Sequence, residues 1–181
     1  MNDVTGALVR ATGLVAGVVC AVALASGLLF SARETGERRR PAWWLDLHQG
    51  LGGLGLVTVA VHVVASVVDS GAGIGLGEVL VPGAATTDRG ALAWGVIGMY
   101  LIAAAVLTTW PRRIANRRLW RAIHVASIAG MVSALVHGYQ MGSDATRLVS
   151  RLGLLALVAP MTYAVVVRGV DAGLRKDRGR T

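Results

Sequence analysis

Charge is scarce in this sequence. Only 15% of its 181 residues are charged, whereas a soluble domain carries about a quarter. The charged residues also occur in groups with long apolar runs between them, and the mean hydropathy is +0.60. This pattern excludes an ordinary soluble domain and is typical of an all-α integral membrane protein that crosses the bilayer several times.

Cysteine is nearly absent too. The single cysteine, Cys20, lies inside an apolar run. One cysteine excludes a disulfide within the chain and a cluster of thiolate metal ligands. We interpret Cys20 as a small packing residue.

Five apolar runs are long enough to cross the hydrocarbon layer, which takes about 20 helical residues. They lie near residues 8–31, 43–68, 91–110, 119–140 and 149–168. The first is interpreted as a retained span because it is too long for a signal peptide and lacks a clear cleavage site. We expect a single transmembrane domain over residues 1–181, ending in a basic cytoplasmic tail at 169–181.

Lysine and arginine gather in three segments, at 33–42, 111–121 and 168–181. Together these hold fourteen of the eighteen basic residues. With five spans, all three segments lie on one side of the membrane, and the positive-inside rule makes that side cytoplasmic. We therefore expect the N-terminus outside and the C-terminus in the cytoplasm of a cell, taken to be bacterial. This topology, together with anionic lipid headgroups, explains the net charge of +8 without nucleic acid.

All four histidines fall within predicted spans, His48 and His62 in the second and His124 and His137 in the fourth. Ionisable side chains are costly inside a membrane and mark functional sites by default. At about 1.5 Å rise per residue, the two histidines of each span lie about 20 Å apart along the helix. Both spans run from inside to outside, so His48 is level with His124, and His62 with His137. Each level offers two imidazoles, a pair suited to six-coordinate haem iron.

Other metal sites fit this pattern less well. Zinc takes four tetrahedral ligands, usually with Cys or carboxylate among them. A single four-histidine site is excluded by the axial separation of about 20 Å. Haem c needs a Cys-x-x-Cys-His motif, which the sequence lacks. The ligand set therefore favours two haem b groups, which would carry electrons across the bilayer.

The two histidine spacings differ by one residue. The fourteen residues from His48 to His62 return to within about 40° of the same helix face, whereas the thirteen from His124 to His137 leave an offset of about 140°. The fourth span must either be distorted, for example near Gly130, or present its histidines from different sides.

The glycine-rich run at 50–55 lies between His48 and His62. It does not predict a dinucleotide site, because no strand precedes it and it sits inside an apolar span. Glycine is common where membrane helices pack closely. We interpret the run as close packing that also lets a flat cofactor approach the backbone.

A His-x13-His pair on one span, an intervening helix and a His-x12-His pair on the next resemble the ferric reductase-like transmembrane domain. That family includes NADPH oxidases, ferric reductases and the haem subunit of a bacterial periplasmic methionine sulfoxide reductase system. The resemblance covers roughly residues 40–168. It implies that His48 and His124 hold an inner haem and that His62 and His137 hold an outer one. The family domain usually has six spans, one more than this sequence shows.

The resemblance implies a membrane cytochrome b that moves electrons as a component of an oxidoreductase. The oxidases continue into a flavin and nicotinamide domain, whereas thirteen residues follow Arg168 here. We therefore expect a separate flavoprotein reductase or membrane quinol as electron donor, and an extracytoplasmic acceptor. One alternative is a quinone-linked haem subunit of a larger oxidoreductase. An alternative from another class is a non-redox membrane protein with structural histidines.

Arginine clusters flank the predicted inner level, just before the second span and at the start of the fourth. Arginine binds carboxylates through paired hydrogen bonds, and haem propionates are carboxylates. Arg40, Arg118 and Arg121 are therefore candidate cofactor-binding residues, although topology explains any one of them equally well. Arg121, three residues before His124, is the strongest candidate.

Overall fold

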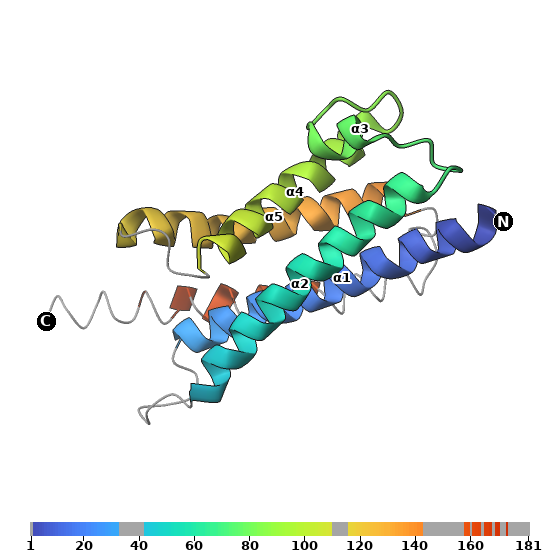
Figure 1. Ribbon diagram of the computed structural model, residues 1–181. Coiled ribbons are helices and arrows are strands. Elements are labelled where there is room, and N and C mark those ends of the chain that lie inside the picture. The colour runs from blue at the N-terminus through green and yellow to red at the C-terminus, as the bar shows by residue number, and fades with distance from the viewer. Residues whose placement is uncertain are drawn as a thin grey trace, which may run out of the picture.

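The computed structural model describes residues 2–32, 42–109 and 116–142, and separate residues between 158 and 173. This part of the chain contains helices and no strand (Figure 1). The helices are α1 (Asn2–Ala32), α2 (Ala42–Val68), α3 (Leu76–Leu80), α4 (Arg89–Leu107) and α5 (Arg117–Met141). The predicted all-α fold class is confirmed.

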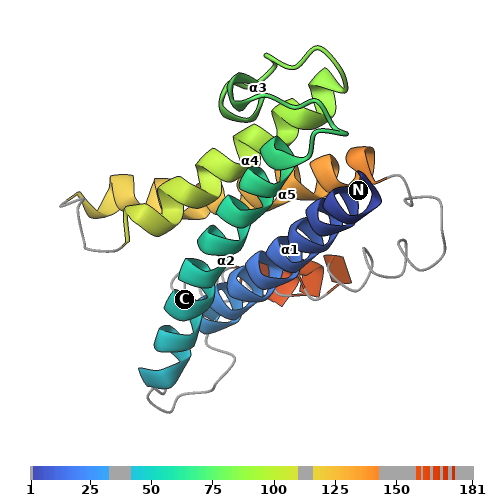
Figure 2. The ribbon, with the colours of Figure 1, turned by 45° about the vertical axis from the view of Figure 1, so that its right-hand side comes forward.

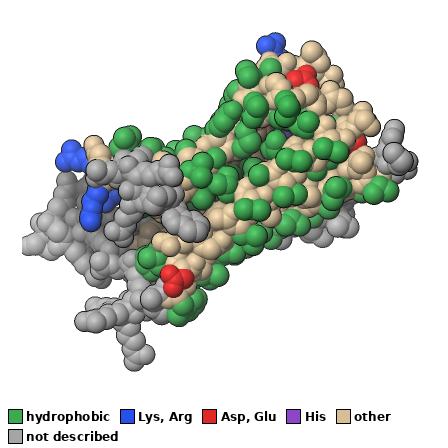
Figure 3. All heavy atoms as spheres, in the orientation of Figure 1, with side chains coloured by type: hydrophobic (Ala, Val, Ile, Leu, Met, Phe, Trp, Pro, Cys, Tyr) green, Lys and Arg blue, Asp and Glu red, His purple; other side chains and the backbone are tan. Residues whose placement is uncertain are grey.

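Within the described residues, four helices are long and apolar enough to cross a membrane, namely α1, α2, α4 and α5. They coincide with the first four predicted spans. Hydrophobic side chains cover the visible face between the two ends, and charged side chains lie toward the ends (Figure 3). Leu14, Val61 and Val132 are each at least half exposed on this surface. An apolar surface this extensive is suited to contact with lipid. The chain is therefore a multi-pass membrane protein.

Most of the predicted fifth span, 149–168, lies outside the described residues. Those of its residues that are described, from 158 onward, are helical. One of them, Met161, is buried in a small cluster with Ala21 of α1 and Met131 of α5. The fifth span stays a prediction, and Met161 gives it one packed contact with the rest of the bundle.

The four long helices form two antiparallel pairs, α1 with α2 and α4 with α5 (Figures 1 and 2). Most contacts between helices lie within these pairs, and few join one pair to the other. In the second pair, a Cβ added to Gly98 would lie 3.0 Å from the carbonyl oxygen of Gly130. In the first, a Cβ on Gly55 would lie 2.9 Å from Sγ of Cys20. Small residues thus let each pair pack closely, which supports a packing role for Cys20.

Helix α5 is continuous from Arg117 to Met141. Its N-cap is Asn116, whose side-chain oxygen accepts hydrogen bonds from the backbone N–H groups of Arg118 at 2.9 Å and Leu119 at 3.3 Å. The helix is regular through Gly130, which serves the crossing with α4 instead. The thirteen-residue offset of about 140° therefore has to be met within one continuous helix.

The segment between α2 and α4 contains the short helix α3. The hydroxyl of Tyr100 in α4 donates to the carbonyl of Leu80 at 2.6 Å. The carboxylate of Glu78 accepts the backbone N–H of Gly75 at 3.0 Å and that of Thr86 at 3.1 Å. These donors hold the pKa of Glu78 below its ordinary value, because they bind the charged form. The segment is therefore an ordered cap on the bundle.

Asp69 ties this cap to α1. Its side chain is buried, and its Oδ1 accepts the hydroxyl of Thr5 at 2.8 Å and the backbone N–H of Gly71 at 3.1 Å. The start of α1, the end of α2 and the cap therefore lie at one end of the molecule (Figure 1). The sequence predicted that these segments share one side of the membrane. That this side is the outer one stays a prediction from the basic residues.

Candidate functional site

The four histidines lie in two pairs at different levels of the bundle. The rings of His48 and His124 have their centroids 5.8 Å apart, with an interplanar angle of 80°. Those of His62 and His137 are 6.2 Å apart at 68°. Each pair joins α2 of one helix pair to α5 of the other. The spacing of the histidines in the sequence predicted this pairing, and the structure confirms it.

The separation within each histidine pair is compatible with one metal ion between two imidazoles. With metal–nitrogen bonds of about 2.0–2.1 Å, two rings on opposite sides of one ion have centroids about 6.4 Å apart. The observed separations of 5.8 and 6.2 Å are close to that value. Among the described residues, no group of three or more His, Cys, Asp or Glu side chains could hold a metal. Each level therefore offers two imidazoles, not the four ligands of a structural zinc site.

Three of the four imidazoles are oriented by backbone carbonyls of the neighbouring helix. The distances from Nδ1 to the carbonyl oxygen are 2.9 Å for His48 and Ala23, 3.1 Å for His62 and Val9, and 2.9 Å for His137 and Ala91. A carbonyl only accepts, so each Nδ1 carries the proton and donates it. Nε2 is then the nitrogen free to bind a metal. Proteins fix metal-binding histidines in this way.

Glycine gives each of these rings access to its carbonyl. A glycine stands four residues after every acceptor, one helical turn further on. An added Cβ would lie 2.9 Å from the His62 ring at Gly13, 2.6 Å from the His48 ring at Gly27 and 2.8 Å from the His137 ring at Gly95. Larger residues at these positions would push the imidazoles off their acceptors.

Reasoning from the sequence missed these acceptors and glycines, although a signal for two of them exists. Ala-Thr-Gly at 11–13 and Ala-Ser-Gly at 25–27 lie fourteen residues apart, the same interval as His48 and His62. An antiparallel neighbour needs its acceptors at the interval of the histidines that they bind. A third copy of the pattern, Ala-Trp-Gly, occupies 93–95 in α4.

His124 is oriented differently from the other three. Its Nδ1 is buried and has no hydrogen-bond partner in the described part of the chain. Its ring stacks on that of Trp120, with centroids 5.0 Å apart and planes 16° apart. Trp120 stands one turn earlier on α5, so the same helix supplies the ligand and the aromatic surface that steadies it.

The structure describes two of the three arginines that were predicted to contact the cofactor. Arg40 lies outside the described residues. Arg118 and Arg121 are exposed near the start of α5. Arg121 is three residues from His124 and on the same side of the helix. Binding of propionates by these residues stays a prediction.

Glycines also reduce the side-chain volume on α2 between its two histidines. Gly52 faces α4, where an added Cβ would lie 3.8 Å from a methyl carbon of Val106. A Cβ on Gly53 would meet nothing within 4 Å. Met131 is the largest fully buried side chain among the described residues, and most of the other buried hydrophobic residues there are alanines. Small residues near the imidazoles are compatible with a flat group between the helix pairs.

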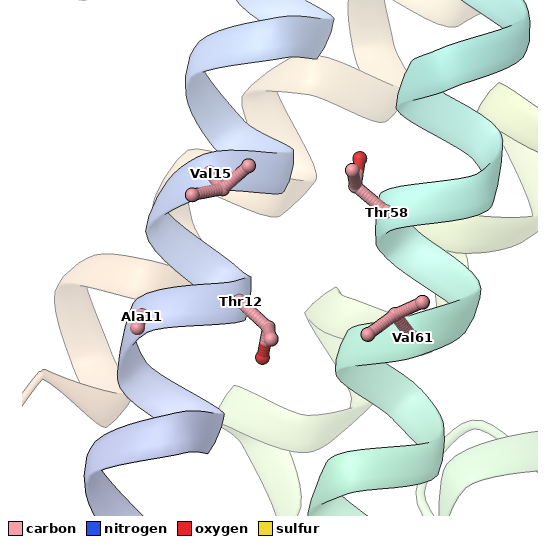
Figure 4. A pocket seen from close by; sticks show the side chains of 5 residues that line it. All are labelled: Ala11, Thr12, Val15, Thr58 and Val61. Atoms are coloured by element: carbon pink, nitrogen blue, oxygen red, sulfur yellow. The ribbon is translucent and has the colours of Figure 1, made fainter.

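A separate hollow of about 180 Å³ opens between α1 and α2 (Figure 4). It is lined by Ala11, Thr12, Val15, Thr58 and Val61. The hydroxyls of Thr12 and Thr58 donate to carbonyls of their own helices. A hydroxyl has one proton to donate, so this hollow offers no free donor to a quinone carbonyl. Its apolar lining suits a lipid chain.

The chain matches no model of a known protein family, no curated protein and no solved structure. The resemblance to the ferric reductase-like domain, which rests on histidine spacing, therefore stays a hypothesis.

Proposed function

We propose that this protein is a membrane cytochrome b with two haem b groups, one held by His48 and His124 and the other by His62 and His137. The observation that carries the proposal is the separation of the opposed imidazoles, 5.8 and 6.2 Å between centroids. Bound haem supplies one-electron chemistry. The protein supplies the ligands, their orientation and the distance between the two sites.

The described residues fit haem in two further respects. Three Nδ1–H groups are bound to carbonyls, which leaves Nε2 free. Glycines 13, 27 and 95 leave room for the imidazole rings, which a Cβ at any of the three positions would meet. A non-redox protein with structural histidines accounts for the carbonyl bonds. It does not account for four imidazoles opposed in two pairs across the interface between the helix pairs.

The spacing of the two sites suits transport across the bilayer. Residues fourteen apart on α2 are separated by about 21 Å along the helix, which is most of a hydrocarbon layer of about 30 Å. An electron that enters at one haem would therefore cross most of the bilayer by a single transfer to the other haem. We accordingly assign the protein to the ferric reductase-like class of oxidoreductase components, in a bacterial plasma membrane.

Electrons would come from another component. Arg117, Arg118 and Arg121 expose positive charge at the His48–His124 end, and such a surface attracts an acidic flavoprotein. We expect the isolated chain not to oxidise NADPH, and added salt to slow reduction by a flavoprotein. A membrane quinol is the alternative donor, in a quinone-linked complex, and its reduction of the haems should not depend on salt. The acceptor would be extracytoplasmic.

A haem count tests the function directly. The purified protein should contain two haems b per chain by pyridine haemochrome assay, with low-spin ferric EPR signals. His62→Ala or His137→Ala should remove one signal, and His48→Ala or His124→Ala the other. Gln49→Ala is the matched control, because Gln49 is exposed beside His48 and should keep both haems. A purified protein without haem, or four histidine variants that all keep two, would exclude the proposal.

A further inference from the structure

The cap between α2 and α4 extends along the side of α4. Its short helix α3 packs against α4 (Figures 1 and 2), and the hydroxyl of Tyr100 donates to the carbonyl of Leu80 at 2.6 Å. Tyr100 stands eleven residues after Arg89, the first residue of α4, which is about 16 Å along the helix. A tyrosine in a helix leans back toward the N-terminus, but its side chain covers less than half of that distance. The carbonyl of Leu80 therefore lies beside the body of α4 and not at its end.

The length of α4 shows how deep this contact lies in the membrane. The helix has 19 residues, about 28 Å, and the hydrocarbon layer is about 30 Å thick. A span this short needs its whole length to cross, so the side chain of Tyr100 lies in hydrocarbon. Tyr100 is 47% exposed, and that flank of α4 is therefore open to lipid. The part of the cap that meets Tyr100 lies in the same layer.

The side chains of this part of the cap are apolar and exposed. Leu76, Leu80 and Val81 are 66%, 48% and 55% exposed. Leu76 and Leu80 are one turn apart and share a face of α3. Val79, between them, is buried and fastens α3 to the bundle. Lipid is the surrounding that stabilises such a face.

The backbone of the cap is bonded within the protein, as hydrocarbon requires. The N–H group of Val81 donates to the carbonyl of Gly77 at 2.9 Å. The carbonyl of Leu80, which follows the last turn of α3, accepts the hydroxyl of Tyr100. This one bond satisfies two polar groups that would otherwise be costly in lipid.

Glu78 lies on the opposite face of α3. At about 100° per residue, it is about 160° around the helix from both Leu76 and Leu80. Its carboxylate accepts the backbone N–H of Thr86 at 3.1 Å, and Thr86 precedes α4 by three residues, at the water end of the span. Helix α3 thus has an apolar face and a charged face, which is the arrangement of a helix that lies in a membrane interface.

We propose that the cap is a lipid-binding element that inserts Leu76, Leu80 and Val81 into the acyl chains around the start of α4, at a depth set by Tyr100. The partner is the bilayer and not a soluble protein, because the surface lies beside a helix that needs its whole length to cross the membrane. The inference requires neither haem nor a particular orientation of the chain in the membrane.

Spin labels on single cysteines measure this depth. The label is placed by Leu80→Cys in the full chain with Cys20→Ala, in phosphatidylcholine vesicles. Leu14→Cys is the lipid control, because Leu14 is 62% exposed within α1, and Thr87→Cys is the water control, because Thr87 is exposed just before α4. Power saturation compares collisions with oxygen, which concentrates in hydrocarbon, and with a nickel chelate, which stays in water.

The label at Leu80 should resemble the label at Leu14, with oxygen the more frequent collision partner. The label at Thr87 should collide more often with the nickel chelate. A Leu80 label that behaves like the Thr87 label would overturn the proposal. Leu76→Cys provides the same test on the same face of α3 if Leu80→Cys does not fold.

Tyr100→Phe tests what sets the depth. The variant keeps the aromatic ring and leaves the carbonyl of Leu80 unpaired in hydrocarbon, so the segment should move toward water. Collisions of the Leu80 label with the nickel chelate should then increase. Tyr139→Phe is the matched control, since Tyr139 is exposed on α5, and should leave the label unchanged. If Tyr100→Phe also leaves it unchanged, Tyr100 does not set the depth.

Discussion

The Nδ1–H of His48 donates to the carbonyl of Ala23 across 2.9 Å, and this bond fixes α2 against α1 at the level where His48 faces His124. The same carbonyl accepts the hydroxyl of Ser26 at 2.8 Å. The ring approaches this crowded acceptor only because Gly27, the next residue, has no side chain.

Gly27→Ala should therefore disturb the His48–His124 site. The new Cβ would lie 2.6 Å from Cε1 of His48, so the ring must leave the Ala23 carbonyl. Haem content should fall from two toward one per chain, with loss of the signal that His48→Ala removes. Gly17→Ala is the control, since its Cβ meets nothing within 4 Å and it gains the same helix propensity of about 1 kcal/mol. Two intact haems in Gly27→Ala would contradict the role of Gly27 in giving the His48 ring access to the Ala23 carbonyl.

Gly98→Ala should loosen both sites at once. Its Cβ would lie 3.0 Å from the carbonyl oxygen of Gly130 and 3.2 Å from the backbone nitrogen of Ala134. Backbone cannot yield as a side chain can, so α4 and α5 must separate, at a cost of about 1–3 kcal/mol. Because α5 carries one ligand of each pair, thermal unfolding in detergent should release both haems at a lower temperature. Gly138→Ala, which meets nothing within 4 Å, should melt like the wild type, and equal melting of both variants would refute the close crossing.

Glu78 should make the cap between α2 and α4 sensitive to acid. Its pKa is lowered in the fold by the N–H groups of Gly75 and Thr86, so its contribution is complete above the ordinary value of 4.5. It is lost as the pH falls through the lowered pKa. Hydrogen exchange at these two amides, corrected for intrinsic rates, should stay slow at neutral pH and quicken only below the ordinary range. Glu78→Gln should speed the exchange of both amides at neutral pH. An unchanged rate in that variant would rule out their protection by the Glu78 carboxylate.

The membrane orientation predicts where reporters fused to the chain will be found. A reporter inserted at Gly83, in the turn after α3, should be exported, and one fused after Thr181 should stay in the cytoplasm. The cause is the concentration of arginine and lysine in the segments assigned to the cytoplasm. Paired alkaline phosphatase and green fluorescent protein fusions measure both positions. The opposite result would exchange the inner and outer sites and leave the histidine pairs as they are.

The sequence by itself determined the membrane helices and the partners among the histidines. A helix in lipid satisfies its backbone hydrogen bonds internally, so a long apolar run specifies a span without help from distant residues. The helical rise and the alternating direction of successive spans then set the height of each histidine. His48 with His124, and His62 with His137, follow from those two quantities alone.

Only the tertiary structure decided how each imidazole is held. Which carbonyl a ring meets depends on the rotation of each helix about its axis, and close contacts between distant residues, such as Gly98 with Gly130, fix that rotation. They also place Gly95 against the ring of His137. The lack of a side chain at such a glycine matters only once the helices are packed, because packing brings the position within reach of a ring.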